Sequence, residues 1–421
     1  MATTLSRRAF LDALAAAPLA AWAWPSWMPR LAFAPAQQGS RGDVLVVVFL
    51  RGAADALNIV VPHGEAAYFR IRPTLAVPRP DDRRPEKALR IIDLDGFFGF
   101  HPALAPLLPA WHAGQLAVVH ACGAPDESRS HFQAMELMER GLTDLHGPAS
   151  GWIARHLASL DTGNTSPLRA VGLGDRVQQS LRGSIPVTAL RSIADFHLGG
   201  DLAAAQTMQE ALAKMYRGEG ELQGIGQDTL HILDTLASLD PLAYRPSDGA
   251  RYPDGDLGMS LRQVAALVKA DVGLEAAAID VGGWDTHFAQ GSSEGLMAGL
   301  LDDLAGGLAA FHADLADEMN RITLVVMTEF GRRAYENASL GTDHGHGGLM
   351  FLLGGHVEGG RVHAQWPGLE PEQLFGPGDL AVTVDYRDVL AEICLKRLNN
   401  PAMDRIFPDF TASMRGVIRV A

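Results

Sequence analysis

The sequence predicts an α/β fold with a mostly parallel central sheet flanked by helices. Short, continuous apolar runs are typical of strands that are buried on both faces of a parallel sheet. Here such runs alternate with helical segments, as right-handed crossover connections require. Polar clusters follow several of the runs, at the strand ends where the ligands of parallel sheets gather.

The apolar runs place the strands in order along the chain. We expect strands at residues 43–50, 116–120, 276–281, 322–327 and 348–354. Helical segments precede three of them, at residues 102–112, 257–269 and about 294–320. A stretch at about residues 195–256 is rich in Ala, Leu, Gln and Gly and ends in a turn-rich sequence. It predicts a helical insertion within one α/β domain of residues 37–421.

Residues 1–36 have the pattern of a twin-arginine export signal. Arg7 and Arg8 precede an apolar stretch that ends near Trp24, and Ala34-Pro35-Ala36 offers a small-residue cleavage site. The stretch falls short of the roughly 20 residues of a membrane-spanning helix. The alternative, an N-terminal helix of the fold, is disfavoured because nothing here is amphipathic. We therefore expect a periplasmic or extracellular protein, with no stable membrane insertion after signal cleavage.

Charge and cysteine content narrow the range of partners. The formal charge of −14 becomes −16 once residues 1–36, with three Arg and one Asp, are removed. This charge argues against binding to nucleic acid or to an anionic membrane surface. Cys122 and Cys394 each lie in an apolar run, so we expect two buried thiols rather than a disulfide.

The predicted strand ends carry residues that suit a divalent metal. Asp285 and His287 lie two residues apart just past a strand, so both side chains can reach the same side of an extended segment. Asp285 could instead cap the following helix. The expected ligands, most of which should converge, are Asp55, Asp285, His287, Glu329, Asp343, His344 and His346. Carboxylates mixed with imidazoles favour one or two ions of Zn²⁺ or Mn²⁺.

Ser130, Arg129 and Arg51 are the candidate catalytic residues. Ser130 precedes good helix formers, so it is either an N-cap or a nucleophile toward a phosphoryl or sulfuryl group at an anion-binding helix start. Arg129 or Arg51 would hold the oxygens of the substrate. Arg51 and Asp55 flank a small-residue turn and are equally consistent with a structural ion pair at the sheet edge.

Five motifs spread over nearly the whole mature chain form a specific set. They are Leu50-Arg51-Gly52-Ala53-Ala54-Asp55-Ala56-Leu57-Asn58, Ser130-His131-Phe132, Gly283-Trp284-Asp285-Thr286-His287, Thr328-Glu329-Phe330-Gly331-Arg332 and Gly341-Thr342-Asp343-His344-Gly345-His346-Gly347-Gly348. Together they resemble the exported family called domain of unknown function 1501, which is grouped with the alkaline phosphatase and sulfatase superfamily. The resemblance implies an alkaline phosphatase-like sheet, one or two divalent metals, and a nucleophile at a helix start. Within this pattern, Phe330 stands where an imidazole ligand is usual.

Two functions are consistent with these observations. The first is an exported metal-dependent hydrolase of phosphate or sulfate esters, acting on a small-molecule or polymer-borne anionic ester. The metal would polarise the ester oxygen, while Ser130 would attack or orient a water. The alternative is a non-catalytic exported binding or assembly protein that retains the alkaline phosphatase-like fold.

Replacing both Arg7 and Arg8 by Lys should trap the precursor in the cytoplasm, because the paired arginines are what identify the signal. Cell fractionation of the variant and of the native precursor measures the effect. Unimpaired export of the double variant would show that residues 1–36 are not a twin-arginine signal.

Overall fold

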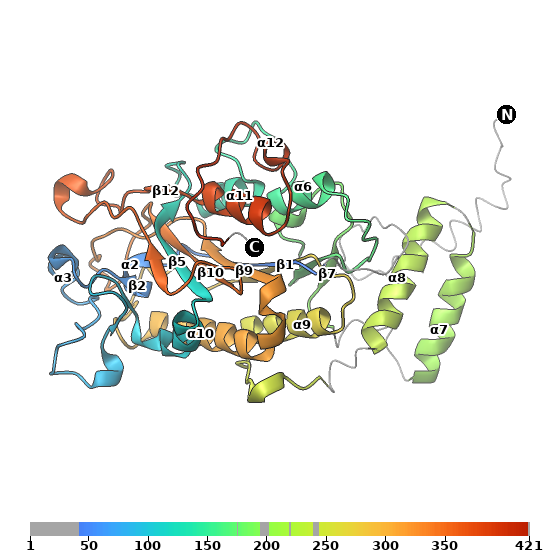
Figure 1. Cartoon of the computed structure of the whole chain (residues 1–421), viewed down its shortest axis with the longest axis horizontal. Coiled ribbons are helices and arrows are strands. Elements are labelled where there is room, and N and C mark those ends of the chain that lie inside the picture. Colours follow the sequence, from blue (N-terminus) through green and yellow to red (C-terminus); the bar gives the residue numbers. More distant parts are fainter. Residues whose placement is uncertain (1–41, 175, 194–201, 219, 239–243, 420–421) are drawn as a thin grey trace.

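The computed structural model describes residues 42–174, 176–193, 202–218, 220–238 and 244–419. The predicted signal, residues 1–36, lies outside these ranges, as do parts of the predicted insertion. Within them, the chain forms an α/β structure in which helices cover both faces of one large sheet (Figure 1). No helix in the described part of the chain is both long enough and apolar enough to cross a membrane.

The large sheet contains all five strands that the apolar runs predict. In space the strands follow the order β11-β5-β10-β9-β1-β8-β6-β7, and β12 also pairs with β5. Their bounds are β1 Val44–Leu50, β5 Leu116–Gly123, β6 Ala170–Leu173, β7 Thr188–Leu190, β8 Ala276–Val281, β9 Ile322–Thr328, β10 Gly348–Gly354, β11 Arg361–His363 and β12 Val384–Asp385. A small second sheet consists of β2 Val60–Val61, β4 Gly99–Phe100 and β3 Ile92–Asp93.

The large sheet is mixed, which corrects the expectation of a mostly parallel sheet. β10 runs antiparallel to both of its neighbours, β5 and β9, with Phe351 opposite Val326 and Gly354 opposite Thr323. The error has a physical origin, because a continuous apolar run reveals burial on both faces but not the direction of the strand. As a result, β10 begins at the same edge of the sheet at which β9 ends.

Side chains alternate between two hydrophobic cores, one on each face of the sheet. On β1, Val44, Val46, Val48 and Leu50 enter the first core, whereas Leu45, Val47 and Phe49 enter the second. Figure 1 shows the two helical layers on either side. The first core is covered by α4 Leu108–His112, α9 Asp256–Lys269 and α10 Leu296–Asp314. The second is covered by α5 His131–Arg140, α6 Trp152–Ser159, α11 Tyr386–Lys396 and α12 Met403–Ile406.

Two of the predicted helices contain 3₁₀ segments. The expected helix at 102–112 begins as a 3₁₀ helix, Pro102–Leu107, because Pro106 lacks the N–H group that an α-helical interior needs. The expected helix at about 294–320 is α10 followed by a 3₁₀ segment, Ala316–Arg321. Two short helices, α2 Ala56–Ile59 and α3 Ala66–Ile71, follow β1 and β2.

Within the predicted insertion, the structure describes a pair of helices. They are α7 Leu202–Met215 and α8 Glu221–Ser238, which lie side by side at one end of the molecule in Figure 1. Ile232 and Leu236 of α8 are buried in the first core, so the pair is tied to the main body through α8.

Two cysteine thiols and two histidine imidazoles are buried in the interior of the protein. Cys122 and Cys394 are free, buried thiols, as their apolar surroundings predict. His120 is fully buried, with Nδ1 accepting from the Ala121 N–H and Nε2 donating to the Val60 carbonyl. His156 is also buried, and Asn400 donates to its Nδ1. Burial lowers the pKa of each imidazole to about 4.

These two histidines predict that the fold loses stability as the pH falls from 6.5 toward 4. Their pKa is lower in the folded chain than the ordinary 6.5, so the unfolded chain binds more protons in this window. Each contributes a slope of up to about 1.4 kcal/mol per pH unit to the free energy of unfolding. Urea unfolding at a series of pH values should show a shallower slope for His156→Gln. An unchanged slope in this variant would contradict the assignment.

Candidate metal centre

Three imidazoles and one carboxylate converge at the carboxyl edge of the sheet. Nε2 of His344 lies 2.9 Å from Nε2 of His131 and 2.9 Å from Nε2 of His287. Oδ1 of Asp285 lies 3.2 Å from Nε2 of both His344 and His287, and Oδ2 lies 3.6 Å from Nε2 of His131. Ligand atoms of His131, Asp285 and His344 all lie within 4.8 Å of one another.

Three separate chain segments supply these side chains. His131 is the first residue of α5, which follows β5. Asp285 and His287 lie in the loop that follows β8, and His344 lies in the loop that leads into β10. Because β10 is antiparallel to β9, the residues that precede it reach the edge to which β5 and β8 also deliver their loops.

A second layer of acceptors holds the far nitrogen of each ring. Nδ1 of His131 lies 2.6 Å from Oε1 of Glu329, and Nδ1 of His344 lies 3.0 Å from the carbonyl oxygen of Arg129. Nδ1 of His287 lies 3.3 Å from Oδ1 of Asp343. A carbonyl or carboxylate oxygen only accepts, so Nδ1 of each ring donates to it, and in the neutral form of the ring the lone pair is on Nε2, which faces the centre. Metal-binding histidines typically have this outer support.

The donor set fits a divalent cation. Nε2 lone pairs and a carboxylate that face one another at short range are stabilised by a positive charge among them. The separations of 2.9–3.6 Å that the ligand atoms of His344 and Asp285 make with the other ligand atoms resemble the roughly 3.4 Å between ligands of a tetrahedral ion with bonds near 2.1 Å. Burial lowers the pKa of His344, which favours the neutral, ligating form of the ring.

Arg332 positions the carboxylate of the centre. Its side chain is fully buried and donates from Nη2 to Oδ1 of Asp285. Partial burial acts to raise the pKa of Asp285, but the hydrogen bond and the charge of Arg332 outweigh it and hold that pKa below its usual value. Asp285 is therefore ionised at neutral pH and available to a cation.

Close packing around Glu329 fixes His131. Glu329 is buried, and its Oε1 also accepts from the Gly52 N–H at 2.8 Å, while Thr328 donates to Oε2. Gly52 has a φ of +123°, and a Cβ there would lie 2.5 Å from the backbone nitrogen of Asp285, so this close approach requires glycine. Phe330 stacks on the His131 ring at 5.0 Å and supports the ligand without being one.

Of the seven ligands expected from sequence, the structure brings Asp285, His287 and His344 together. Glu329 and Asp343 lie behind the rings that they hold. His346 lies elsewhere, with its ring stacked on Phe375 at 4.8 Å. Asp55 is buried, and both of its oxygens are occupied in an ion pair with the fully buried Arg72. Oδ2 of Asp55 also accepts from Gln290 at 2.7 Å.

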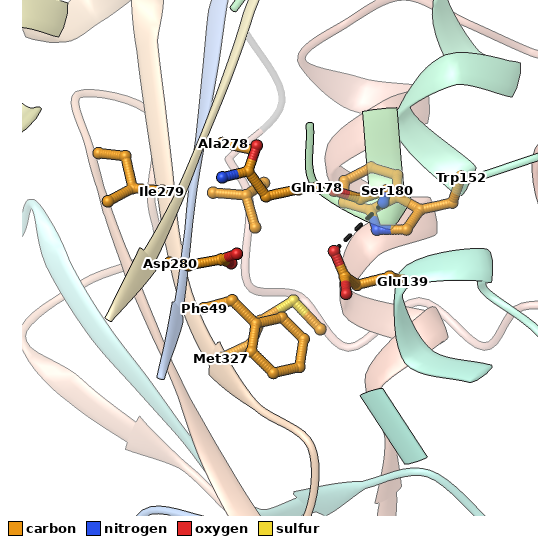
Figure 2. Close-up of a pocket in the computed structure, with 10 residues that line it drawn as sticks. Phe49, Glu139, Trp152, Gln178, Ser180, Ala278, Ile279, Asp280 and Met327 are labelled. Atoms are coloured by element: carbon orange, nitrogen blue, oxygen red, sulfur yellow. Dashed lines mark hydrogen bonds between the residues drawn. The ribbon is translucent and has the colours of Figure 1, made fainter. Parts of the chain in front are cut away.

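Arg51 lies in a separate ionic network. It donates to Glu139 of α5 at 2.8 Å and to Asp280 at the end of β8 at 2.7 Å. Figure 2 shows these two carboxylates on opposite sides of a narrow cavity whose other lining residues include Phe49, Trp152 and Met327. The cavity has about 220 Å³ of empty space, including its solvent-open part, but it is too narrow for a water molecule. Arg51 therefore links α5 to the sheet through its ion pairs with Glu139 and Asp280.

Ser130 and Arg129 border the centre directly. Ser130 is exposed and occupies the N-cap position of α5, but its hydroxyl makes no capping hydrogen bond. The alternative of a simple cap thus lacks the interaction that defines it. The side chain of Arg129 is about one-third exposed and forms an ion pair with the buried Asp379, while its carbonyl holds His344.

His131 is the ligand candidate that the sequence reasoning missed. It lies within the Ser130-His131-Phe132 motif, in which the sequence analysis assigned a role to the serine hydroxyl but none to the imidazole. The position of His131 in the sequence could have identified it. A histidine at the start of a helix that follows a buried strand lies at the same edge of the sheet as Asp285 and His287.

Removing the imidazole of His287 should prevent binding of the proposed divalent ion without unfolding the chain. His287→Ala should abolish stoichiometric metal binding, because His287 is 42% exposed and contributes to the centre rather than to a core. Glu329→Gln should weaken metal affinity by about 10- to 100-fold by loosening His131. Elemental analysis and competition with a chelator dye measure both effects.

His346→Ala is the matched control from the same glycine-rich segment. It should retain metal, because its ring contacts Phe375 rather than the converging imidazoles. Equal metal content in His287→Ala and the native protein would rule out the centre. So would selective metal loss in His346→Ala.

Comparisons with known proteins place the chain in a family. A search of curated proteins finds no match. The family described as "Protein of unknown function (DUF1501)" matches residues 43–397, a range that includes His131, Asp285, His287, His344 and the residues that support them. The chain therefore belongs to the DUF1501 family.

Proposed function

We propose that this protein is an exported hydrolase of phosphate or sulfate esters that depends on one divalent metal ion. The observation that carries the proposal is the convergence of His131, His287, His344 and Asp285 beside the serine at the start of α5. A metal-binding group next to a hydroxyl and a helix N-terminus is the combination that ester hydrolysis of these anions requires.

The four side chains would hold Zn²⁺ or Mn²⁺. Imidazole nitrogens favour Zn²⁺, and a carboxylate is compatible with either ion. When bound, the ion would supply Lewis-acid polarisation of the ester oxygen. Glu329, Asp343 and the Arg129 carbonyl would keep the rings oriented through the reaction, since each already holds an Nδ1.

The start of α5 would bind the anionic group of the ester. The first backbone hydrogen bond of this helix runs from the Ala134 N–H to the Ser130 carbonyl, so the N–H groups of the first turn have no partner within the helix. These donors and the helix dipole favour a negative charge there. Arg129 adds a partly exposed guanidinium next to the same turn. Arg51 is left out of this proposal because it pairs with two carboxylates, Glu139 and Asp280, and is less exposed than Arg129, which pairs with Asp379.

Ser130 would attack the phosphorus or sulfur atom, or orient the water that does so. Its hydroxyl is exposed, makes no cap bond, and is carried by the residue directly before the His131 ligand. Support for an alkaline phosphatase-like relationship comes from the same arrangement, in which a helix-start serine and a metal-binding group share the carboxyl edge of an α/β sheet. The twin-arginine pattern of residues 1–36 supports export.

A panel of phosphate monoesters, phosphate diesters and sulfate esters tests the proposal. Each would be assayed with added Zn²⁺, Mn²⁺, Ca²⁺ or Mg²⁺. We expect turnover of at least one class with Zn²⁺ or Mn²⁺, and a loss on the order of 10²-fold or more in kcat for Ser130→Ala with metal content unchanged. Ser339→Ala, at an exposed position of a neighbouring loop, is the control and should keep full activity.

The opposite outcome is equally informative. If metal is bound in stoichiometric amount and no ester is turned over, the hydrolase proposal fails. A non-catalytic exported binding protein would then be the better account of the same centre.

A further inference from the structure

Two phenylalanines that directly follow proposed ligands in the sequence are exposed to solvent. The side chains of Phe132 and Phe288 are 86% and 73% exposed, more than any other large hydrophobic residue in the part of the chain that the structure describes. Each directly follows a proposed ligand, Phe132 after His131 and Phe288 after His287. Because consecutive Cα atoms lie about 3.8 Å apart, the backbone of each phenylalanine lies next to that of a proposed ligand.

The two segments that carry these rings meet at one point. Nε2 of His131 and Nε2 of His287 each lie 2.9 Å from Nε2 of His344, so the segments that carry Phe132 and Phe288 both reach this group. A third apolar side chain, Leu340, is 54% exposed on the neighbouring loop. That loop is joined to the Phe288 segment by hydrogen bonds from Ala289 to Ser339 and from Gln290 to Leu340.

Packing within the chain does not account for these rings. Phe330 supplies the aromatic support of the ligands, since it is buried and stacks on His131. Phe132 and Phe288 leave most of their surface in water instead. Single exposed apolar residues are ordinary on protein surfaces, but a cluster around an open polar site marks a binding surface.

We propose that Phe132, Phe288 and Leu340 bind the apolar alcohol part of the ester substrate. The inference rests on the proposed hydrolase function and narrows its substrate class to aryl or alkyl esters of phosphate or sulfate, as opposed to esters of small polar alcohols. The anionic group would lie at the ion and the start of α5, and the apolar group would lie against the rings. Aromatic rings bind apolar groups by burial and, for aryl groups, by ring contacts.

The exposure of the ligands favours a substrate over a protein partner on this surface. Asp285 and His287 are 48% and 42% exposed, so the ion-binding group is open to solvent on the segment that also carries Phe288. A protein partner or a second copy of the chain that covered the rings would also close this opening. A substrate would bridge both features with one molecule.

Binding of non-hydrolysable phosphonates tests the inference separately from turnover. The full chain loaded with Zn²⁺ would be titrated by calorimetry with methylphosphonate, octylphosphonate and phenylphosphonate. We expect octyl- or phenylphosphonate to bind about tenfold or more tightly than methylphosphonate, because each buries additional apolar area. Phe132→Ala and Phe288→Ala should each reduce this preference severalfold and leave methylphosphonate affinity unchanged.

Two controls make the result specific. Phe288→Leu should restore much of the preference, since it keeps an apolar side chain. Met414→Ala, which removes a side chain that is 44% exposed in the C-terminal segment, should have no effect. Methylphosphonate binding without any preference for the apolar phosphonates would overturn this inference alone. Binding of no phosphonate to the metal-loaded chain, together with no turnover of any phosphate or sulfate ester, would overturn the hydrolase proposal as well. A native dimer that dissociates in both alanine variants, with no phosphonate preference, would assign the rings to a self-interface.

Discussion

The buried guanidinium of Arg332 is the interaction on which the proposed centre depends. Its donors reach three loops that are distant in sequence, with partners at the carbonyls of Gly52, Ala53, Trp284 and Thr342 and at the carboxylate of Asp285. Burying a charge costs several kcal/mol unless its hydrogen bonds are satisfied. The hydrogen bonds that satisfy the charge of Arg332 hold the loop after β1, the loop after β8 and the loop before β10 against one another. The carboxylate is thereby held where the imidazoles meet.

The direction of β10 brings the loops that Arg332 joins to one edge of the sheet. The segment from Glu329 to Gly347 leaves the end of β9 and returns to the start of an antiparallel strand, so both of its ends lie at one edge of the sheet. Glu329 and His344 can therefore act on the same group, one by holding His131 and the other by facing it. A parallel β10 would begin at the opposite edge and would carry His344 away from the loops after β5 and β8.

The centre combines a rigid interior with an open exterior. Behind the rings lie buried groups, Glu329 and Phe330, whose contacts restrict His131. By contrast, the residues that follow two of the proposed ligands, Phe132 and Phe288, are largely exposed. Ligands need fixed orientations to keep their lone pairs on one point, whereas a substrate needs access. The buried polar group behind the imidazoles is Glu329, and hydrogen bonds offset the free-energy cost of burying it.

The sequence by itself determined five strands of the large sheet, but not β6, β7, β11 or β12, and it indicated the edge of the sheet that carries the proposed centre. Apolar runs located the strands, and Asp285, His287 and His344 could be chosen because strand ends in an α/β sheet collect polar ligands. Only the tertiary structure decided which carboxylates face the centre. Asp55 pairs with Arg72, Glu329 and Asp343 hold imidazole rings, and His131 joins the converging side chains as a proposed ligand. These roles depend on strand direction and on side-chain orientation between distant segments, and neither quantity is encoded in local residue patterns.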